Sequence, residues 1–388
     1  MASSILEPGL YTKARLPLAK AETMPRWCYT SDEFYQEEVR QIFRRTWNFV
    51  GRVDEIGSGG DFLTVDLFGD SIVVVRDRSD TIRAFANTCR HRGTQLVTGT
   101  GNCRVLSCPY HSWAFALNGG LIGAPGMEGV EGFNKADYGL IPVRLETWGG
   151  FMFVSLDLNC VPLQQHLGNA LEIFAPYRFE DMVVTRKTEY DLPCNWKLYL
   201  ENAMEDYHTA TVHRVSIGTQ VCTREDTVGE WDAIHMPAKS TSAILPGEVS
   251  PFPEIESLKG RSAEGTYFTV VYPNWFFAAA QDCMWWLHIA PRGPTRSIVT
   301  HGACFPRKTR ERPDFADVVQ KYYKRWDKSL PEDNNISVLQ QLGLQSSFNR
   351  PGRLSLHEPV VHAIDQWVLD RVVGENTASL VSANDRRA

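Results

Sequence analysis

The sequence predicts an α+β protein in which a small all-β domain precedes a larger α+β domain. Short strand patterns separated by Gly-rich turns fill residues 48–158, which is typical of an all-β unit. Beyond residue 158 a run of strand patterns is closed by helical ones. That order favours an antiparallel sheet flanked by helices. The predicted division is a helical arm over 1–47, the all-β domain over 48–158 and the α+β domain over 159–388.

The elements follow from periodicity and turn residues. The arm ends in a helical pattern in which Thr30 and Glu33 have the spacing of a capping box. The strands expected in the all-β domain are DFLTVDLFG, SIVVVRD, TIRAFAN and GGFMFVSLD. The α+β domain is expected to hold the strands VVTRKTEYDLP, TYFTVVYPNWFFAA, CMWWLHIAP and SIVTHGACF. Its expected helices are LQQHLGNALEIFAPY, NWKLYLENAMEDYHTATVH, DFADVVQKYYKRWDKSL and EPVVHAIDQWVLDRVV.

Composition excludes several classes of function. The 388 residues are 43% hydrophobic and 22% charged, as in ordinary globular proteins. A net charge of −6 without a Lys/Arg block predicts no nucleic-acid partner. No run of 18 apolar residues is present, so no membrane span is expected, and the N-terminus lacks the pattern of a signal peptide. Nine irregularly spaced cysteines indicate a reducing compartment, and we expect the cytoplasm. The lack of GxGxxG and Walker motifs predicts that this chain binds neither NAD nor ATP.

A metal-binding pattern lies inside the all-β domain. Cys89-x-His91 is followed after sixteen residues by Cys108-x-x-His111. Structural zinc is the simplest alternative, but zinc sites usually use C-x₂₋₄-C and H-x₃₋₅-H spacings. Two short loops that each supply one thiolate and one imidazole suit a Rieske [2Fe–2S] centre, in which one iron takes two cysteines and the other two histidines.

The residues around this pattern support the same interpretation. Gly93 and Pro109 allow tight loops, and Trp113 is placed to shield a cluster from water. Cys103 is left over and is expected to be a small buried residue. CRHRG and CPYHSW resemble the motifs of the Rieske oxygenase family. Ser112 is a departure, because these oxygenases more often have glycine there, and we expect a modest effect on packing around the cluster.

A second group of polar residues lies in NWKLYLENAMEDYHTATVH. His208 and His213 are five residues apart, which on a straight helix turns their rings about 140° from each other. The helix must therefore bend, or end between them. Glu205 lies one turn before His208, with Asp206, Asn202 and Glu201 nearby. Two histidines and one carboxylate on one face of Fe(II) form the facial triad of non-haem oxygenases, which leaves positions open for O₂.

The same stretch resembles the catalytic domain of the Rieske oxygenase α subunit, which carries E-N-x-x-E/D-x-Y-H-x-x-x-x-H. This resemblance implies that His208 and His213 bind the iron and that Asn202 belongs to the active site. It also implies that Glu205 links the iron histidine to a cluster histidine, corresponding to His111, of a neighbouring subunit. Many members have aspartate at the position of Glu205, whereas glutamate occurs in some that act on quaternary ammonium compounds.

The third iron ligand is expected far along the chain. In LPEDNNISVLQQLGLQS, the resemblance points to Asp333, because an acidic-Asp pair precedes a helix with a V-Q-x-G-L-x-S-like pattern. Asp327 is the alternative, since distance in sequence does not decide between them. The tail segment GRLSLHEPVVHAIDQWV also fits the family, so the resemblance extends from about residue 45 to 375.

The resemblance implies a helix-grip, START-like catalytic domain and a terminal oxygenase, either a mono- or a dioxygenase. It further implies a separate NAD(P)H-dependent reductase, with or without a ferredoxin, and a homotrimer. The alternatives are a Rieske electron carrier without oxygenase activity and a ligand-binding module with an inert iron pocket.

The substrate is expected to be a small molecule that reacts with O₂. Eight aromatic residues are concentrated in one region; core packing is expected to account for most of them, and a few are expected to line a pocket that suits an aryl ring or a cationic ammonium. The Glu205 variant and the short chain favour the carnitine and betaine demethylase-like branch. The eight candidates are Tyr267, Phe268, Tyr272, Trp275, Phe276, Phe277, Trp285 and Trp286.

Overall fold

The computed structural model describes residues 4–374 and divides the chain into two compact units. One unit spans residues 45–163. The other combines the N-terminal segment up to Arg44 with the chain from Gln164 onwards. The N-terminal segment, which the sequence sets apart as an arm, is thus part of the same compact unit as the α+β domain. In the described part of the chain, no helix has both the length and the apolar character needed to cross a membrane.

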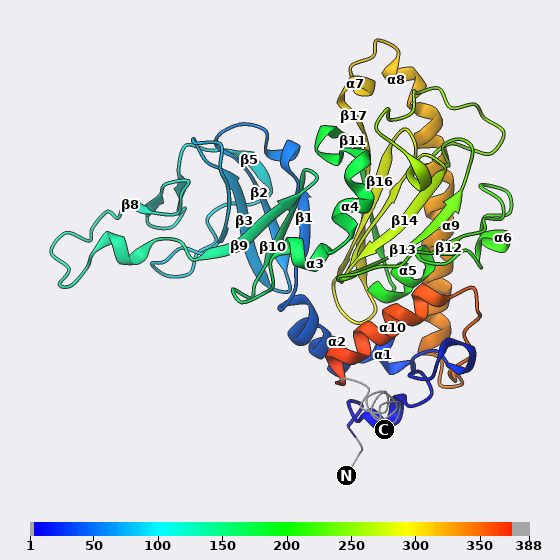
Figure 1. The fold of residues 1–388 in the computed structure, drawn as a ribbon. Helices are drawn as coiled ribbons and strands as arrows, with labels where there is room; N and C mark the ends of the chain where they lie inside the picture. Colours follow the sequence, from blue (N-terminus) through cyan, green and yellow to red (C-terminus); the bar gives the residue numbers. More distant parts are fainter. Residues whose placement is uncertain (1–3, 375–388) are drawn as a thin grey trace, which may run out of the picture. The chain divides into compact units, whose positions relative to one another are not determined.

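The unit of residues 45–163 is all-β, as predicted. Its main sheet has seven strands in the order β1-β10-β9-β4-β3-β2-β5, and a small sheet has the order β6-β7-β8 (Figure 1). The strands are β1 (Asn48–Arg52), β2 (Asp61–Leu67), β3 (Asp70–Arg76), β4 (Ile82–Ala86), β5 (Thr100–Asn102), β6 (Leu106–Ser107), β7 (Ala114–Phe115), β8 (Leu121–Gly123), β9 (Pro142–Trp148) and β10 (Phe151–Ser155).

Strand β3 shows why this unit has two small cores. Successive side chains of a strand point to opposite faces of its sheet. Val73 and Val75 pack into the core that also contains Cys89, Cys108 and Trp113. Ile72 and Val74 pack into a second core on the opposite face. The buried residues of β3 therefore pack beneath the metal-binding loops on one face of the sheet and into a separate core on the other.

The second unit is built on a seven-stranded antiparallel sheet with the order β11-β17-β16-β15-β14-β13-β12. The strands are β11 (Met182–Leu192), β12 (Thr223–Arg224), β13 (Trp231–Pro237), β14 (Gly265–Val271), β15 (Trp275–Ala279), β16 (Met284–Pro291) and β17 (Ser297–Pro306). The α-helices are α1 (Trp27–Thr30), α2 (Asp32–Glu38), α3 (Leu163–Leu167), α4 (Ala170–Phe174), α5 (Trp196–Ala203), α6 (Thr209–Val212), α7 (Arg307–Arg310), α8 (Phe315–Val318), α9 (Gln320–Gln345) and α10 (Pro359–Val372). The predicted α+β class is confirmed.

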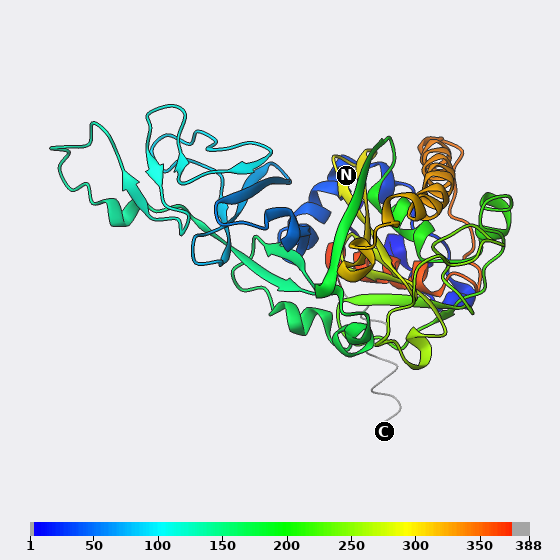
Figure 2. The ribbon, with the colours of Figure 1, turned by 90° about the horizontal axis from the view of Figure 1, so that it is seen from above.

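Helices cover both faces of this sheet. The long helix α9 lies along one face in both ribbon views (Figure 1 and Figure 2), where the Trp326 and Trp285 rings are 5.6 Å apart. On the opposite face the ring of Phe174, at the end of α4, is 4.8 Å from that of Phe277. Buried aromatic contacts of this kind hold each layer in place. The pairing of one long helix with an antiparallel sheet is the arrangement that the helix-grip expectation describes.

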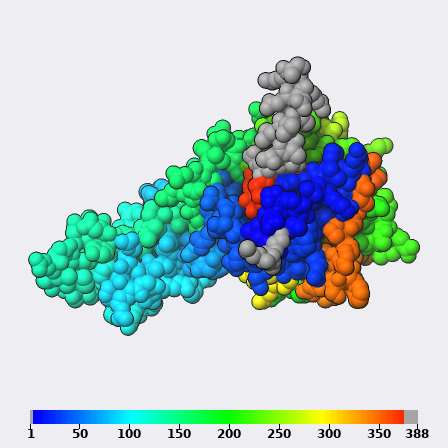
Figure 3. Space-filling model, turned by 90° about the horizontal axis from the view of Figure 1, so that it is seen from below, coloured from blue at the N-terminus to red at the C-terminus, as the bar shows by residue number. Residues whose placement is uncertain are grey.

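The N-terminal segment packs against the end of the same unit. Figure 3 shows it beside helix α10. Arg15 forms an ion pair with Asp370 at 2.5 Å, and the side-chain amide of Gln366 donates to the carbonyl of Ala14. Segments more than 350 residues apart in sequence are thereby joined.

Three predicted helices differ from the structure. The expected capping box at Thr30 and Glu33 is wrong, because the hydroxyl of Thr30 donates to the carbonyl of Arg26 and Ser31 caps α2 instead. The helix expected over LQQHLGNALEIFAPY is broken at Gly168, where φ is +50° and an added Cβ would lie 1.7 Å from the carbonyl oxygen of Val228. The helix expected to stop before Pro331 continues through it, so that α9 runs to Gln345.

Candidate functional site

The end of helix α5 brings His208 and His213 together. The side chain of Asn195 caps the helix by accepting from the backbone N–H of Lys197, and the helix ends at Ala203. His208 precedes the short helix α6 and His213 follows it. Because neither residue is part of α5, the 140° separation on a straight helix does not apply, and the two ring centroids lie 5.1 Å apart. The chain therefore ends the helix before the first histidine rather than between the two.

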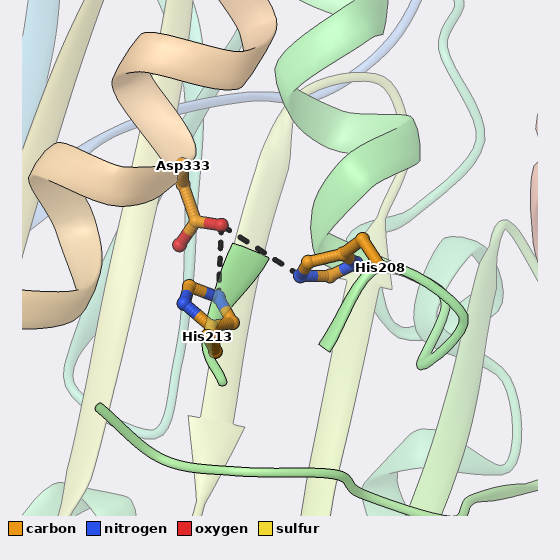
Figure 4. Close-up of side chains that lie close together, drawn as sticks. All are labelled: His208, His213 and Asp333. Carbon is orange, nitrogen blue, oxygen red and sulfur yellow. Dashed lines mark ion pairs between the residues drawn. The ribbon is translucent and has the colours of Figure 1, made fainter. Parts of the chain in front are cut away.

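Helix α9 supplies the carboxylate that faces both rings. Asp333 Oδ1 lies 3.1 Å from His213 Nε2 and 3.7 Å from His208 Nε2 (Figure 4). One ligand atom from each of these three residues lies within 4.8 Å of the others. We call His208, His213 and Asp333 the iron triad. Asp327, the alternative third ligand, instead forms an ion pair with Arg186 and is 55% exposed.

Two glutamates orient the histidines of the iron triad. His208 Nδ1 lies 2.7 Å from a Glu205 carboxylate oxygen, and the other oxygen accepts from the backbone N–H of His208. His213 Nδ1 lies 2.7 Å from Glu332 Oε2. With both Nδ1 atoms engaged, each Nε2 is presented to the position that a metal would take, which is the usual arrangement of ligating histidines. The donor set therefore fits a divalent iron ion.

Asn202 and Glu332 complete the immediate surroundings. The side-chain amide of Asn202 donates to Asp333 Oδ1 at 2.9 Å, so this predicted residue does contact the iron triad. Glu332 was not predicted from the sequence. Its position directly before Asp333 would indicate a role at the site only to a reader who already knows that helix α9 brings both carboxylates to His213.

The local charge favours a protonated His213 when no metal is bound. Burial alone would lower the pKa of His213, but the hydrogen bond to Asp333 and its negative charge, together with Glu332, outweigh burial and raise that pKa. A ligating histidine must be neutral, so metal binding displaces this proton. We therefore expect metal affinity to fall as the pH is lowered through the raised pKa of His213.

Replacing Glu332 by glutamine is expected to weaken Fe(II) binding about 10- to 100-fold, because His213 loses the charged acceptor that fixes its ring. Anaerobic titration of the iron-depleted protein with Fe(II) measures the dissociation constant. Glu311→Gln, at an exposed position, is the matched control. Wild-type affinity in Glu332→Gln would show that other contacts orient His213.

A pocket adjoins the iron triad, and all three members of the triad help to line it. Three of the eight aromatic candidates line it: Phe268, Phe276 and Trp285. The alternation of strands β14 to β16 turns Tyr267 and Phe277 to the opposite face, where both rings pack against Phe174. This agrees with the expectation that core packing accounts for most of the eight and that a few line the pocket.

The two predicted cluster loops share one backbone geometry. The N–H of Cys89 donates to the carbonyl of Thr94, and that of Cys108 to the carbonyl of Trp113. Each loop is closed a second time by a bond back to its cysteine carbonyl, from Gly93 in the first loop and from Ser112 in the second. These two residues have φ of 75° and 58°. Ser112 thus occupies a left-handed position that glycine adopts more readily, which accounts for the glycine usual in the family.

The side chains of the loops meet in the way a cluster requires. Cys89 and Cys108 are each 3% exposed, whereas His91 is exposed. The His91 and His111 ring centroids are 4.7 Å apart, and Trp113 stacks on His91 at 4.9 Å. His111 Nδ1 is buried and has no hydrogen-bond partner among the described residues, as expected of an atom reserved for a metal.

The thiols of the two loops respond to different surroundings. Burial raises the pKa of Cys89. Burial opposes ionisation of Cys108 as well, but hydrogen bonds from the backbone N–H groups of Tyr110 and His111 outweigh it and lower the pKa. Backbone N–H groups aimed at sulphur favour the thiolate, which is the form that binds a metal.

The spacing of the four donors favours two metal ions over one. Four ligands of a single tetrahedral zinc ion lie about 3.5 Å from one another. In the described part of the chain, only the iron triad brings three such ligand atoms within 4.8 Å of each other. Cys103 does not share the backbone geometry of the two loop cysteines: its N–H donates to the carbonyl of Gly60. The arrangement fits a two-iron cluster with cysteines inside and histidines outside.

Comparisons with known proteins agree with this geometry. The family model described as the ring hydroxylating alpha subunit, catalytic domain, matches residues 179–374. The model of the Rieske [2Fe-2S] domain matches residues 46–134. Together they cover both groups of predicted ligands.

Two curated relatives are oxygenase subunits. The chain is 36% identical over 197 residues to the carnitine monooxygenase oxygenase subunit of Escherichia coli (strain K12), which covers 50% of this chain and 53% of that protein. It is 29% identical over 367 residues to the glycine betaine monooxygenase oxygenase subunit of Chromohalobacter salexigens, covering 86% of this chain and 82% of the relative. The matched stretch thus spans about half the length of the carnitine monooxygenase subunit.

Two solved structures share the fold. The quaternary ammonium Rieske monooxygenase CntA in complex with L-carnitine has a TM-score of 0.75 at 24% identity, covering 90% of this chain and 96% of that one. Naphthalene 1,2-dioxygenase from Rhodococcus sp. bound to indole has a TM-score of 0.78 at 20% identity, covering 96% of this chain and 100% of that one.

Proposed function

Because the chain belongs to the family of ring hydroxylating alpha subunits and carries a Rieske domain, we propose that it is the terminal oxygenase of a multicomponent Rieske system. The observation that carries this proposal is the convergence of His208, His213 and Asp333 at a pocket that is lined in part by aromatic side chains. An electron carrier with a cluster alone has no use for such a triad. The intact triad also argues against a ligand-binding module with an inert pocket.

The ligand assignments form part of the proposal. Cys89, His91, Cys108 and His111 would hold the [2Fe–2S] cluster, and the iron triad would hold Fe(II). When bound, the cluster stores one electron and the ferrous ion supplies a redox-active centre at which O₂ is reduced. Oxygen chemistry of this kind needs electrons from outside, so we assign a separate NAD(P)H-dependent reductase, with or without a ferredoxin, as partner.

The chain's own residues position the proposed iron ligands and shield the site from water. Glu205 and Glu332 fix the two histidines with their Nε2 atoms toward the ligand position, and Asn202 restrains Asp333. Ligands held in this way need little reorganisation during a reaction. The apolar side chains of the pocket exclude water and orient the substrate. The chemistry supported is hydroxylation or oxidative demethylation of a small aromatic or quaternary ammonium compound.

We further propose a homotrimer in the cytoplasm. In a quaternary ammonium Rieske monooxygenase that shares this fold, electron transfer is inter-subunit. By analogy, Glu205 would connect His208 to His111 of the partner subunit, so that a ring of chains completes each site. All nine cysteines are free, which suits a reducing compartment.

Glu205→Gln is expected to keep both metals bound but to slow electron arrival at the iron site about 10- to 100-fold, because the charged acceptor of His208 Nδ1 is lost. Rapid-freeze EPR in a single turnover measures that rate. Glu205→Asp, which restores the carboxylate that many relatives carry, should recover part of it. Wild-type kinetics in Glu205→Gln would reject the bridging role.

The test of the proposed activity is turnover with a surrogate reductase, NADH and O₂. Substrate panels of aryl acids and of trimethylammonium compounds are incubated with the enzyme, and products are identified by mass spectrometry with ¹⁸O₂. Incorporation of ¹⁸O into a product, or formation of formaldehyde from an N-methyl group, supports the proposal. Tight binding of panel members without oxygenated product would indicate the inert pocket instead.

A further inference from the structure

One wall of the pocket holds a buried arginine with no acidic partner. Arg325, on helix α9, lines the pocket together with Ser329 and Asp333 and is 5% exposed. Its Nη1 donates to the hydroxyl of Ser329 at 3.2 Å. Its Nε is buried and finds no hydrogen-bond acceptor in the part of the chain that the structure describes.

Two other arginines of this unit do have acidic partners. Arg224 pairs with Asp232 at 2.7 Å, and Arg186 pairs with Asp327 at 2.5 Å. Within residues 4–374, no carboxylate lies within ion-pair distance of Arg325. Removing a charge from water without a partner is costly, so buried arginines are normally paired. Burial lowers the pKa of Arg325 to about 10, yet the group remains charged at neutral pH.

The two carboxylates whose charges act on Arg325 are already engaged. Asp333 belongs to the iron triad and accepts from Asn202, while Glu332 accepts from His213 and Ser216. Their charges act on Arg325 from a distance and offset part of the lowering of its pKa by burial. Neither carboxylate therefore accepts a hydrogen bond from Arg325 Nε.

Arg325 and Asp333 lie at two ends of one row. Residues 325, 329 and 333 are spaced by four along α9, which keeps them near one face of the helix, and eight residues rise about 12 Å along its axis. The pocket thus has an iron-binding end and a cationic end. A molecule that reacts at the first can reach the second with a group several bonds away.

We propose that Arg325 anchors a carboxylate of the substrate, so that this enzyme takes organic acids, including betaine-type zwitterions, and rejects the corresponding alcohols. The proposal rests on the proposed function, because it assigns the substrate class of the same pocket. The planar guanidinium suits a carboxylate, which accepts two parallel hydrogen bonds.

Trp285 strengthens the assignment. The Arg325 guanidinium lies 5.0 Å from the Trp285 ring centroid, so this ring face already carries a cation. A quaternary ammonium group at the same end would meet like charge. A zwitterion must therefore bind with its carboxylate toward Arg325 and its ammonium group toward the iron triad.

Binding to the anaerobic holoenzyme, measured by isothermal titration calorimetry, tests this without turnover. Two matched pairs serve as probes: glycine betaine against choline, and 3-phenylpropionate against 3-phenylpropanol. The acid of at least one pair is expected to bind about 10- to 100-fold more tightly than its alcohol, the range of a charge-assisted hydrogen bond. Which pair shows the preference distinguishes a zwitterionic from an aryl substrate.

Variants assign the preference to Arg325. Arg325→Gln should abolish the preference and leave alcohol binding unchanged, whereas Arg325→Lys should retain part of it. Arg312→Gln, at a half-buried arginine paired with Asp314, should behave as wild type. The proposal is overturned if neither acid outbinds its alcohol in the wild-type protein, or if Arg325→Gln keeps the preference.

The wild-type comparison decides the matter even if Arg325→Gln does not fold, with Arg325→Lys as the second variant. Failure of the proposed oxygenase function appears separately, as an acid preference without oxygenated product.

Discussion

Asp333→Ala is expected to abolish product formation and to remove about one iron per chain while the cluster remains. Asp333 is the only carboxylate facing both histidines of the iron triad in the described structure, with its Oδ1 at 3.1 and 3.7 Å from their Nε2 atoms. Without it, two neutral imidazoles must hold a divalent ion alone. Iron analysis together with the EPR signal of the reduced cluster measures the two centres separately.

Asp327→Ala is the matched control on the same helix. Six residues separate the two positions, which places Asp327 about 120° round helix α9 from Asp333. Its ion pair with Arg186 is at the surface, where such pairs contribute little. We expect wild-type iron content and activity. The opposite pattern, in which Asp327→Ala loses iron and Asp333→Ala keeps it, would refute the assignment of the third ligand.

Cys108→Ser is expected to eliminate the cluster and, with it, turnover driven by the reductase. Cys108 is buried, and the backbone N–H groups of Tyr110 and His111 favour its thiolate. A serine hydroxyl in the same place remains protonated at neutral pH and is a poor iron ligand. Visible absorption, acid-labile sulphide and EPR report the loss, whereas the Fe(II) of the iron triad should still be retained.

Cys103→Ser provides the control for this experiment. Burial raises the pKa of the Cys103 thiol, and the residue packs only at the edge of the core beneath the loops. We expect a full complement of cluster in Cys103→Ser. Loss of the cluster in this variant, with retention in Cys108→Ser, would mean that the wrong cysteine had been assigned to the second loop.

Local signals in the sequence account for most of what could be predicted. Cys89 to His91 and Cys108 to His111 each lie within one short loop, so spacing alone constrains their geometry. His208 and His213 are also close in sequence, although the helix predicted to carry them ends at Ala203. Asp333 lies 120 residues beyond His213, and only the family resemblance selected it over Asp327. The structure brings it to the two histidines through the packing of α9, which periodicity does not reveal.

The features that sequence reasoning missed are tertiary. Glu332 and Arg325 read as ordinary polar residues of an exposed helix until α9 is laid on the sheet, where one contacts His213 and the other lines the pocket. The predicted helix breaks at Gly168, where φ is +50° and the carbonyl of Val228, from a distant segment, approaches too closely for any side chain. Such contacts override local propensity, and the sequence carries no short-range sign of them.

The aromatic segment shows the same limit at a finer scale. Composition alone could not separate the residues that line the pocket from those that fill the core. Strand alternation does so once the sheet is known: Phe268, Phe276 and Trp285 face helix α9, whereas Phe277 faces Phe174. The direction of each side chain, rather than its type, decides whether it can contact a substrate.

The most direct test is elemental: iron, zinc and acid-labile sulphide are quantified in the purified protein, together with EPR before and after reduction. We predict about three irons and two sulphides per chain, with a reduced-cluster signal of the histidine-ligated type. Stoichiometric zinc in place of iron, or iron without labile sulphide, would contradict the assignment of a two-iron relay and a separate ferrous site.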